Sequence, residues 1–219
     1  MRLCGEKMIL IIDYGMGNLR SVEKAFQKLG FPAKVSNSKA ELEKAEGIVL
    51  PGVGAFADCI KNLQGLGLIE PIVKWIKADR PFLGICLGYQ ILFEDSEEFG
   101  LTKGLGIFKG RVKKFSEAMP DPSSPGAFLK VPHMGWNQVR IMKDCPVLQG
   151  IESGSSYYFV HSFYPAPEDK SLIATETEYG IKFASSIAQG NLFACQFHPE
   201  KSQAKGLALL KNFGRMASK

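Results

Sequence analysis

The chain has 219 residues, of which 45% are hydrophobic and 22% charged, and its formal net charge at pH 7 is +5. This composition is that of an ordinary globular domain and excludes an intrinsically disordered chain, because apolar residues are plentiful and the net charge is small for the length. The 23 glycines and 12 prolines follow no period, which excludes collagen and coiled coils.

The first predicted element is residues 8–12, the longest unbroken apolar run of the chain at five residues. This length is far below the roughly 18 residues that suggest a membrane span. The run is also too short for the apolar region of a secretory signal, and only Arg2 and Lys7 precede it as basic residues. It is therefore expected to be a buried strand, and the protein is expected in the cytoplasm without a membrane partner.

Short apolar segments then alternate with segments of helical spacing, and this alternation is typical of βαβ units around a parallel sheet. Further strands are expected at residues 33–36, 47–50, 82–85 and 191–197. Helices are expected at residues 19–29, 41–44, 57–63, 69–78 and 204–216, and helical periodicity also covers 89–93. The expected fold class is therefore α/β, with an open, mostly parallel sheet flanked by helices.

Between residues 104 and 183 the pattern changes to short strands and turns. Loops are expected at 120–126 and 165–169, where prolines cluster with glycine or acidic residues. Antiparallel strands are therefore expected to extend the sheet in the second half of the chain. No repeat or linker divides the sequence, so residues 8–219 are expected to form one domain behind an N-terminal extension at 1–7.

The basic and sulfur-containing residues indicate neither a nucleic-acid partner nor a metal ion. Lysine and arginine are dispersed, and the densest cluster is only Arg111, Lys113 and Lys114, as on a solvated surface. The five cysteines stand at positions 4, 59, 86, 145 and 195, with no C-x-x-C pair among them. They are expected to be reduced thiols, and no zinc or other metal site is expected.

Two glycine pairs follow predicted strands, where α/β proteins bind phosphates. Gly15-x-Gly17 lacks the third glycine of a dinucleotide-binding fingerprint. Gly52-x-Gly54 fits the spacing, but the acidic residue about 20 positions on, Glu70, lies between two predicted helices. No nucleotide cofactor is therefore expected. The turn at Gly52 is either a plain tight turn or one whose backbone N–H groups bind a ligand.

The stretch Gly84-Ile85-Cys86-Leu87-Gly88 has the spacing of a nucleophile elbow and lies between a predicted strand and a predicted helix. The two glycines are required because a Cβ at either position would collide with neighbouring backbone while Cys86 is held in a strained conformation. The thiol is then expected at a helix N-terminus, where the helix dipole favours a thiolate and the Leu87 N–H points towards a developing oxyanion.

A thiol nucleophile requires a base, and the chain contains three histidines. His198 and Glu200 are two residues apart in an extended segment and so project to the same side, where Glu200 can orient the imidazole. Pro199 favours the extended geometry at His198. His133 and His161 each follow an apolar run and are expected in the core or in turns, with a role in lining the site left open.

The elbow, continued to Gln90, and the late His198-Pro199-Glu200 resemble the class I glutamine amidotransferases. Six further stretches are similar, in the same order along the chain, to the glutaminase subunits of histidine biosynthesis: residues 13–19, 51–54, 104–106, 132–137, 158–162 and 197–202. Of these, Pro-His-Met-Gly-Trp-Asn at 132–137 points most directly to those subunits. Phe163 departs from the family pattern, which has tyrosine, and loses a hydroxyl but no backbone group.

The resemblance implies a flavodoxin-like fold and hydrolysis of glutamine to glutamate and ammonia. Cys86 would be the nucleophile that forms a thioester, His198 would protonate the ammonia and then activate water, and Glu200 would hold the His198 tautomer. Backbone N–H groups of Val53 and Leu87 would form the oxyanion hole. The resemblance also implies a set of substrate-binding residues, in which Glu98 faces the α-amino group: Gly52, Gln90, Glu98, His161, Ser162 and Phe163.

The resemblance further implies a partner, a (β/α)₈ cyclase that consumes the ammonia and makes imidazole glycerol phosphate and AICAR, with the two subunits forming a heterodimer. Asn18, Trp136 and Lys201 are the candidates for the docking face. No cofactor is implied.

The same residues bear on three alternative functions. A thiol hydrolase or peptidase on the same scaffold would lack the His-Pro-Glu sequence, and a non-catalytic binding module would lack a member of the triad. A paralogous glutaminase that feeds another acceptor, such as a nucleotide-sugar or polysaccharide amidotransferase, would share all of these residues. The sequence leaves that third alternative open.

Overall fold

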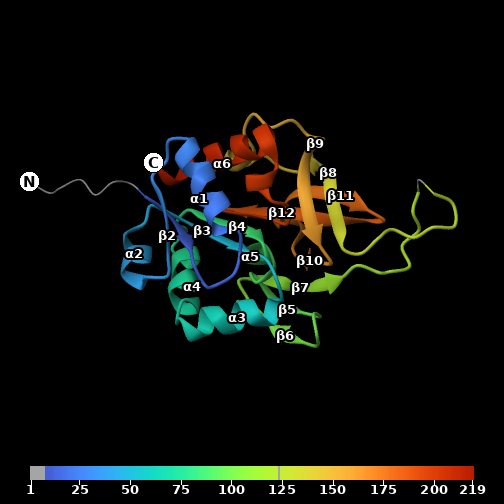
Figure 1. The fold of residues 1–219 in the computed structure, drawn as a ribbon, viewed down its shortest axis with the longest axis horizontal. Helices are drawn as coiled ribbons and strands as arrows, with labels where there is room; N and C mark the ends of the chain where they lie inside the picture. Colours follow the sequence, from blue (N-terminus) through green and yellow to red (C-terminus); the bar gives the residue numbers. More distant parts are fainter. Residues whose placement is uncertain (1–7, 123) are drawn as a thin grey trace, which may run out of the picture.

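The computed structural model describes residues 8–122 and 124–219, so the expected N-terminal extension at 1–7 lies outside the described residues. Within them, the main feature is a nine-stranded sheet (Figure 1). Its strand order is β2 (Ala33–Ser36), β1 (Ile9–Ile12), β3 (Gly47–Gly52), β4 (Phe82–Cys86), β13 (Leu192–Cys195), β12 (Ile181–Gln189), β11 (Ile173–Tyr179), β8 (His133–Ile141) and β9 (Ser155–His161). Strands from β2 to β13 pair in parallel, and each later pair is antiparallel, which confirms the expected antiparallel extension.

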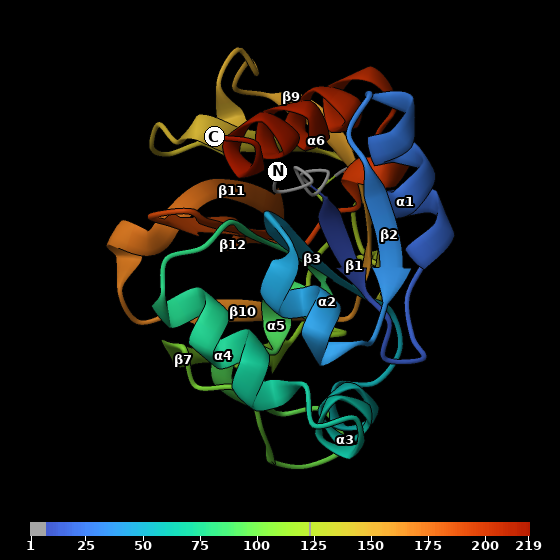
Figure 2. The same ribbon diagram turned by 90° about the vertical axis from the view of Figure 1, so that its left-hand side faces the viewer.

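Helices cover both faces of the parallel half of the sheet (Figure 2). Helices α1 (Leu19–Lys28) and α6 (Gln203–Ala217) lie on one face. Helices α2 (Lys39–Lys44), α3 (Phe56–Gly65) and α4 (Ile69–Lys77) lie on the other. This arrangement is the α/β architecture predicted from the alternating pattern.

Strand β1 shows why the apolar runs are continuous. Ile9 and Ile11 pack in the core beneath α1 and α6, whereas Leu10 and Ile12 pack in the core beneath α2, α3 and α4. All four side chains are buried, because a central parallel strand has helices on both sides. After Ile12 the chain turns at the carboxyl edge of the sheet, which is where α/β proteins bind their ligands.

A second sheet of four strands was not expected from the sequence. Among the described residues its order is β10 (Phe163–Pro167), β7 (Phe108–Lys114), β5 (Phe93–Ser96) and β6 (Thr102–Lys103). The loop expected at 165–169 is therefore wrong for its first three residues, which lie in β10, whereas residues 168–169 connect β10 to the next element. Strand β10 is at the edge of its sheet, where one side has no ladder and a missing proline N–H loses no hydrogen bond.

The helix expected through 89–93 is also wrong beyond its first turn, because α5 (Leu87–Gln90) stops early and β5 begins at Phe93. The carbonyl groups of Ile91 and Leu92 accept hydrogen bonds from the N–H groups of Leu105 and Ile107, at 2.7 and 2.9 Å. These distant partners take the place of the i to i+4 bonds of a continuing helix. Local periodicity could not reveal them.

The other predicted strands and helices are present, with ends within two residues of the predictions. The described residues of the stretch 120–126 form the expected loop, which a bridge between Pro120 and Phe128 closes. Three short 3-10 helices complete the described elements: η1 (Pro146–Leu148), η2 (Lys170–Leu172) and η3 (Pro199–Lys201). No helix in residues 8–122 and 124–219 is long and apolar enough to cross a membrane.

Candidate active site

The predicted elbow is a sharp strand-to-helix turn at the end of β4. Cys86 has φ of 54° and ψ of −106°, a conformation that non-glycine residues rarely adopt. A Cβ on Gly84 would lie 2.7 Å from the Gly88 carbonyl oxygen, and a Cβ on Gly88 would overlap the carbonyl oxygen of Leu50. The prediction that both glycines are needed for close backbone approach is confirmed.

The helix that follows Cys86 is shorter than expected. Helix α5 has four residues, so few peptide dipoles align behind the thiol. The predicted position of Cys86 at a helix N-terminus is present, but the dipole contributes less than expected.

His198 and Glu200 form a buried pair directly after β13. His198 Nδ1 lies 2.8 Å from Glu200 Oε1, and the two side chains are 2% and 1% exposed. His198 has the extended backbone geometry expected before Pro199. The His198 N–H donates to the Tyr158 carbonyl at 2.9 Å, and the Ser202 hydroxyl donates to the His198 carbonyl at 2.6 Å. The imidazole is therefore held through its backbone as well as through Glu200.

The surroundings of His198 favour its protonated form. Burial alone lowers the pKa of His198, but the negative charges of a Cys86 thiolate and of Glu200 more than offset this and raise it to about 10. Nε2 is buried and makes no hydrogen bond of normal length with the described residues, while Cys86 is the group that raises the pKa most. His198 can therefore exchange a proton through Nε2 with Cys86 or with a group bound beside it.

A cavity of about 340 Å³ opens beside Cys86. It brings together Cys86, both predicted oxyanion residues and most of the predicted substrate-binding residues. Its lining residues are Val53, Gly54, Cys86, Leu87, Gln90, Glu98, Pro132, Val160, His161, Ser162 and Phe163. This volume is at the lower end of the range for small-molecule sites in proteins.

The turn after β3 forms one wall of the cavity. Strand register pairs Gly52 with Cys86, so the turn begins beside the nucleophile. A Cβ on Gly52 would overlap the Tyr14 hydroxyl and lie 2.8 Å from the Leu87 Cβ, so only glycine fits here. Gly54 has φ of 102°, which also favours glycine. The two glycines are therefore required by close neighbours at Gly52 and by the backbone conformation at Gly54, beside the nucleophile.

Glu98 lies in the cavity wall with a fixed carboxylate. Its Oε2 accepts a hydrogen bond from the Phe56 N–H at the start of α3, at 2.6 Å. This bond uses one oxygen and leaves the other available to a ligand in the cavity. The geometry suits recognition of a positively charged group.

Gln90 and Gln196 form a buried pair of amides beneath Cys86. Gln90 Nε2 donates to the Phe163 carbonyl at 3.0 Å and to Gln196 Oε1 at 3.1 Å. Gln196 Nε2 in turn donates to Cys86 Sγ at 3.6 Å. Sequence reasoning missed Gln196. The signal was present, because glutamine is the one polar residue in the otherwise apolar stretch 192–197.

His161 is both a core residue and part of the cavity wall. Its Nε2 lies 2.9 Å from His133 Nδ1, and its Nδ1 donates to the Phe163 carbonyl at 2.8 Å. Both rings are buried. The sequence left open whether these histidines line the site. His161 lines the cavity, whereas His133 lies behind it in the core.

The residues predicted to dock the partner lie on neighbouring elements. Trp136 is half exposed, and its ring meets the Tyr158 ring edge-on with centroids 6.2 Å apart. Lys201 Nζ lies 5.8 Å from the centroid of the same Tyr158 ring. Asn18 precedes α1, which packs against η3, the 3-10 helix that contains Lys201. Trp136 and Lys201 thus share one surface around Tyr158.

Taken together, the site offers a strained thiol, an imidazole with a buried carboxylate behind it, and a cavity that Val53 and Leu87 line together with the thiol. This arrangement is typical of acyl transfer through a covalent thioester. Among residues 8–122 and 124–219, no three histidine, cysteine, aspartate or glutamate side chains are grouped as metal ligands.

Comparison with known proteins agrees with this chemistry. The family model of the class-I glutamine amidotransferases matches residues 10–217. The imidazole glycerol phosphate synthase subunit HisH of Syntrophotalea carbinolica is 54% identical over 95% of this chain and 100% of its own length. The subunits of the same name from Geobacter sulfurreducens and Aquifex aeolicus are 54% and 50% identical, over 95% and 96% of this chain and 98% and 97% of their own lengths.

Solved structures show the same fold at much lower identity. The structure titled PurLQS from Thermotoga maritima aligns with a TM-score of 0.71 at 17% identity, over 97% of this chain and 98% of its own. A glutamine amidotransferase from the same organism aligns with a TM-score of 0.66 at 14% identity, over 98% and 99% of the two chains.

Proposed function

Because the chain belongs to the class-I glutamine amidotransferase family, and within it to the HisH subunits of imidazole glycerol phosphate synthase, we propose that it hydrolyses glutamine to supply ammonia for histidine biosynthesis. The observation that carries this proposal is the strained Cys86 at the cavity, with the buried His198–Glu200 pair behind it. The site of action is the cytoplasm.

In the proposed reaction, Cys86 Sγ attacks the carbon of the glutamine side-chain amide and forms a tetrahedral intermediate. His198, which holds its proton at neutral pH, gives that proton to the departing nitrogen, and ammonia leaves behind a glutamyl thioester. His198 then takes a proton from water, which attacks the thioester and releases glutamate. Glu200 accepts from His198 Nδ1 throughout and keeps Nε2 directed at the reacting groups.

The cavity residues divide the binding of glutamine. Backbone N–H groups of Val53 and Leu87 hold the developing oxyanion, and removal of one such donor costs on the order of 3 kcal/mol in the barrier. The free oxygen of Glu98 binds the α-ammonium group. The remaining proposed contacts to the α-substituents come from Gln90 and from the backbone of Gly52, His161, Ser162 and Phe163.

The partner is a (β/α)₈ cyclase subunit, with which the chain forms a heterodimer. Its docking face includes Asn18, Trp136 and Lys201, where a half-exposed indole and a lysine meet around Tyr158. Aromatic side chains that become buried when a partner binds dominate the energetics of many interfaces. The cyclase consumes the ammonia, and the chain delivers the ammonia to it without release into water.

Glutamate release tests this proposal. The purified chain is assayed with glutamine, alone and with the cyclase subunit and its nucleotide ligand, and the Cys86→Ala variant controls for contaminating glutaminases. A large rise with the loaded partner supports both the reaction and the pathway. Activity that is indifferent to the partner would move the protein to another ammonia acceptor, and no activity in any combination would contradict the proposed glutaminase.

A further inference from the structure

The side-chain amide of Gln196 donates a hydrogen bond to the sulfur of Cys86. Gln196 follows β13 and is fully buried, and its Nε2 lies 3.6 Å from Cys86 Sγ. A thiolate is an acceptor only, so it requires the N–H side of the amide to face it. If the Gln196 amide turned over, its oxygen would face the sulfur and repel a negative charge. The orientation of this amide is therefore important for the nucleophile.

The neighbour of Gln196 sets that orientation. Gln196 Oε1 accepts from Gln90 Nε2 at 3.1 Å, and the same Nε2 donates to the Phe163 carbonyl at 3.0 Å. A backbone carbonyl can only accept, so it requires the N–H side of Gln90. Gln90 then presents N–H to Gln196, and Gln196 presents its oxygen to Gln90 and its N–H to Cys86.

The Phe163 carbonyl is held by a second donor, the ring of His161. His161 Nδ1 lies 2.8 Å from the Phe163 oxygen, so the proton of His161 is on Nδ1 and its Nε2 is an acceptor. His133 Nδ1 lies 2.9 Å from that Nε2 and must supply the proton between them. The second histidine is therefore also protonated on Nδ1, and its Nε2 accepts.

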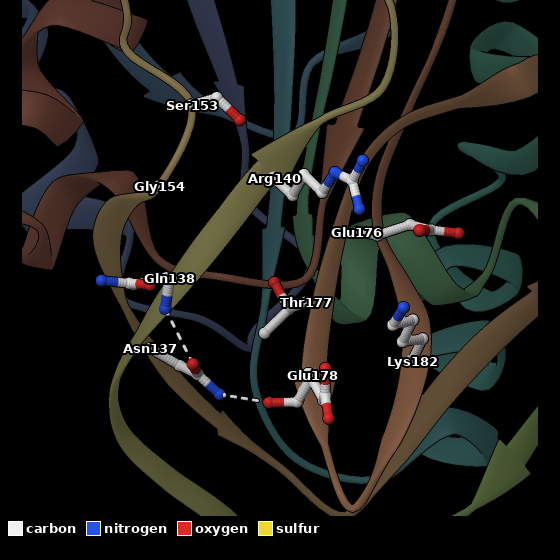
Figure 3. Close-up of a pocket in the computed structure, with 9 residues that line it drawn as sticks. All are labelled: Asn137, Gln138, Arg140, Ser153, Gly154, Glu176, Thr177, Glu178 and Lys182. Carbon is white, nitrogen blue, oxygen red and sulfur yellow. Dashed lines mark hydrogen bonds between the residues drawn. The ribbon is translucent and has the colours of Figure 1, made fainter.

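Asn137 completes the chain of bonds at the protein surface. Its Nδ2 lies 3.2 Å from His133 Nε2 and donates to the Glu178 carbonyl at 2.9 Å, while its Oδ1 accepts from the Gln138 N–H at 2.8 Å. Figure 3 shows these last two bonds at the edge of a surface hollow of about 470 Å³. Because both are bonds to backbone groups, whose donor and acceptor roles are fixed, Asn137 fixes the direction of the bonds up to the Phe163 carbonyl. That carbonyl accepts from both sides, so it fixes the direction of the bonds through Gln90 and Gln196.

The two histidines are suited to this role because they remain neutral. Burial lowers the pKa of His133 to about 4. Burial, with repulsion from a charged His133, lowers the pKa of His161 to about 3. The His133 ring stacks between Phe159 and Tyr179, with centroid distances of 4.8 and 4.0 Å. A neutral imidazole donates at one nitrogen and accepts at the other, as the chain of bonds requires.

We name these residues the amide–histidine network: Asn137, His133, His161, Phe163, Gln90 and Gln196. We propose that the network is a positioning device that holds the Gln196 amide with its N–H towards Cys86 Sγ. Gln196 acts on the nucleophile, and the other members act through it. The contribution to turnover rests on the proposed function, whereas the orientation of the bonds does not.

The first experiment is nitrogen-15 NMR of the imidazole rings in the isolated chain at neutral pH. Three histidines give a simple spectrum, and His133→Phe and His161→Phe assign the signals while keeping an aromatic ring. The expected result is that both His133 and His161 carry their proton on Nδ1. A proton on Nε2 of either ring would break the bonds that run from Asn137 through the two histidines to the Phe163 carbonyl, and would overturn the proposal.

The second experiment measures the rate at which iodoacetamide alkylates Cys86, followed by mass spectrometry of the peptide that contains it. Gln196→Met keeps the size of the side chain and removes the N–H donor. Since a hydrogen bond to a charged group is worth about 1.5–3 kcal/mol, we expect the rate to fall roughly tenfold or more. His161→Phe is expected to lower it by a smaller factor.

Tyr89→Phe is the matched control. The Tyr89 hydroxyl donates to the Ala184 carbonyl at 3.2 Å from the same short helix that contains Gln90, so the variant loses one buried hydrogen bond outside the network. We expect its alkylation rate to stay within twofold of the wild type. Equal rates in Gln196→Met and Tyr89→Phe would overturn the proposal. Neither experiment needs glutamine, so a wild-type chain without glutaminase activity would contradict the proposed function alone.

Discussion

Glu200 Oε1 accepts a hydrogen bond from His198 Nδ1 at 2.8 Å, and both side chains are almost completely removed from solvent. Without competing water, the carboxylate acts strongly on the imidazole and contributes to its raised pKa. The arrangement separates two tasks, since Nδ1 is committed to Glu200 and Nε2 remains for proton transfer.

Cys86→Ala is expected to lower glutamate release by at least roughly three orders of magnitude, because the covalent step is lost. The fold and the binding of the cyclase subunit should be unchanged, since alanine removes one atom from a cavity wall. Steady-state glutamate assays and a binding titration check the two parts. A variant that retains substantial turnover would exclude the thioester mechanism.

His198→Ala is expected to be almost as severe as Cys86→Ala, whereas Glu200→Ala should be roughly 10- to 100-fold milder. Glu200 only orients and stabilises the imidazole, so its loss leaves the nucleophile and the base in place. Single-turnover kinetics of the variants give the comparison. If Glu200→Ala were as inactive as Cys86→Ala, the carboxylate would have a direct role in the chemistry.

Gly88→Ala should destabilise the protein by about 1–3 kcal/mol or more and abolish activity, because its Cβ would overlap the Leu50 carbonyl oxygen next to Cys86. Gly65→Ala, at the end of α3, is the matched control. Nothing lies within 4 Å of its added Cβ, so the change should be neutral or stabilising by up to about 1 kcal/mol. Urea unfolding measures the free energy of unfolding of both variants. Equal values for the two variants would contradict the prediction.

Glu98→Gln should raise the KM for glutamine roughly tenfold or more with a smaller effect on kcat. The amide keeps an oxygen for the Phe56 N–H, so the local structure is retained, but the negative charge for the α-ammonium group is lost. Initial rates over a range of glutamine concentrations measure the split. An unchanged KM would remove Glu98 from the proposed set of substrate contacts.

Stability should fall on acidification because of His133 and His161. Their folded pKa values of about 4 and 3 lie below the ordinary 6.5, so in this window the unfolded chain binds protons that the folded chain does not. The contribution of these two histidines to the free energy of unfolding is therefore greatest above pH 6.5 and decreases as the pH falls towards 4, by up to about 1.4 kcal/mol per pH unit for each histidine. His198 has the opposite sign, since its raised pKa adds stability below pH 6.5 that is lost as the pH rises towards 10.

Urea unfolding between pH 4 and pH 7 checks this slope, with His133→Phe as the comparison. The phenylalanine keeps the stacking between Phe159 and Tyr179 but cannot titrate. Its acid slope should be smaller than that of the wild type. Identical slopes would mean that His133 is not held neutral in the folded protein.

The sequence alone was sufficient for the features that neighbouring residues determine. Gly84 and Gly88 around Cys86 predict the strained elbow, because the steric requirement lies within five residues. The spacing of His198 and Glu200 predicts that their side chains meet, because residues two positions apart in an extended segment project to the same side. Most of the helices and strands follow from apolar periodicity over single elements. The family resemblance rests on these same local stretches.

Only the tertiary structure decided the features that depend on distant partners. Phe93 begins a strand because residues 105 and 107 bond to the carbonyls before it, although its local periodicity is helical. His133 meets His161 because the register of β8 and β9 pairs them across 28 positions. Gln196 reaches Cys86 because parallel strands β4 and β13 end side by side. Such contacts are chosen by the packing of whole elements, whose free energy no local pattern contains.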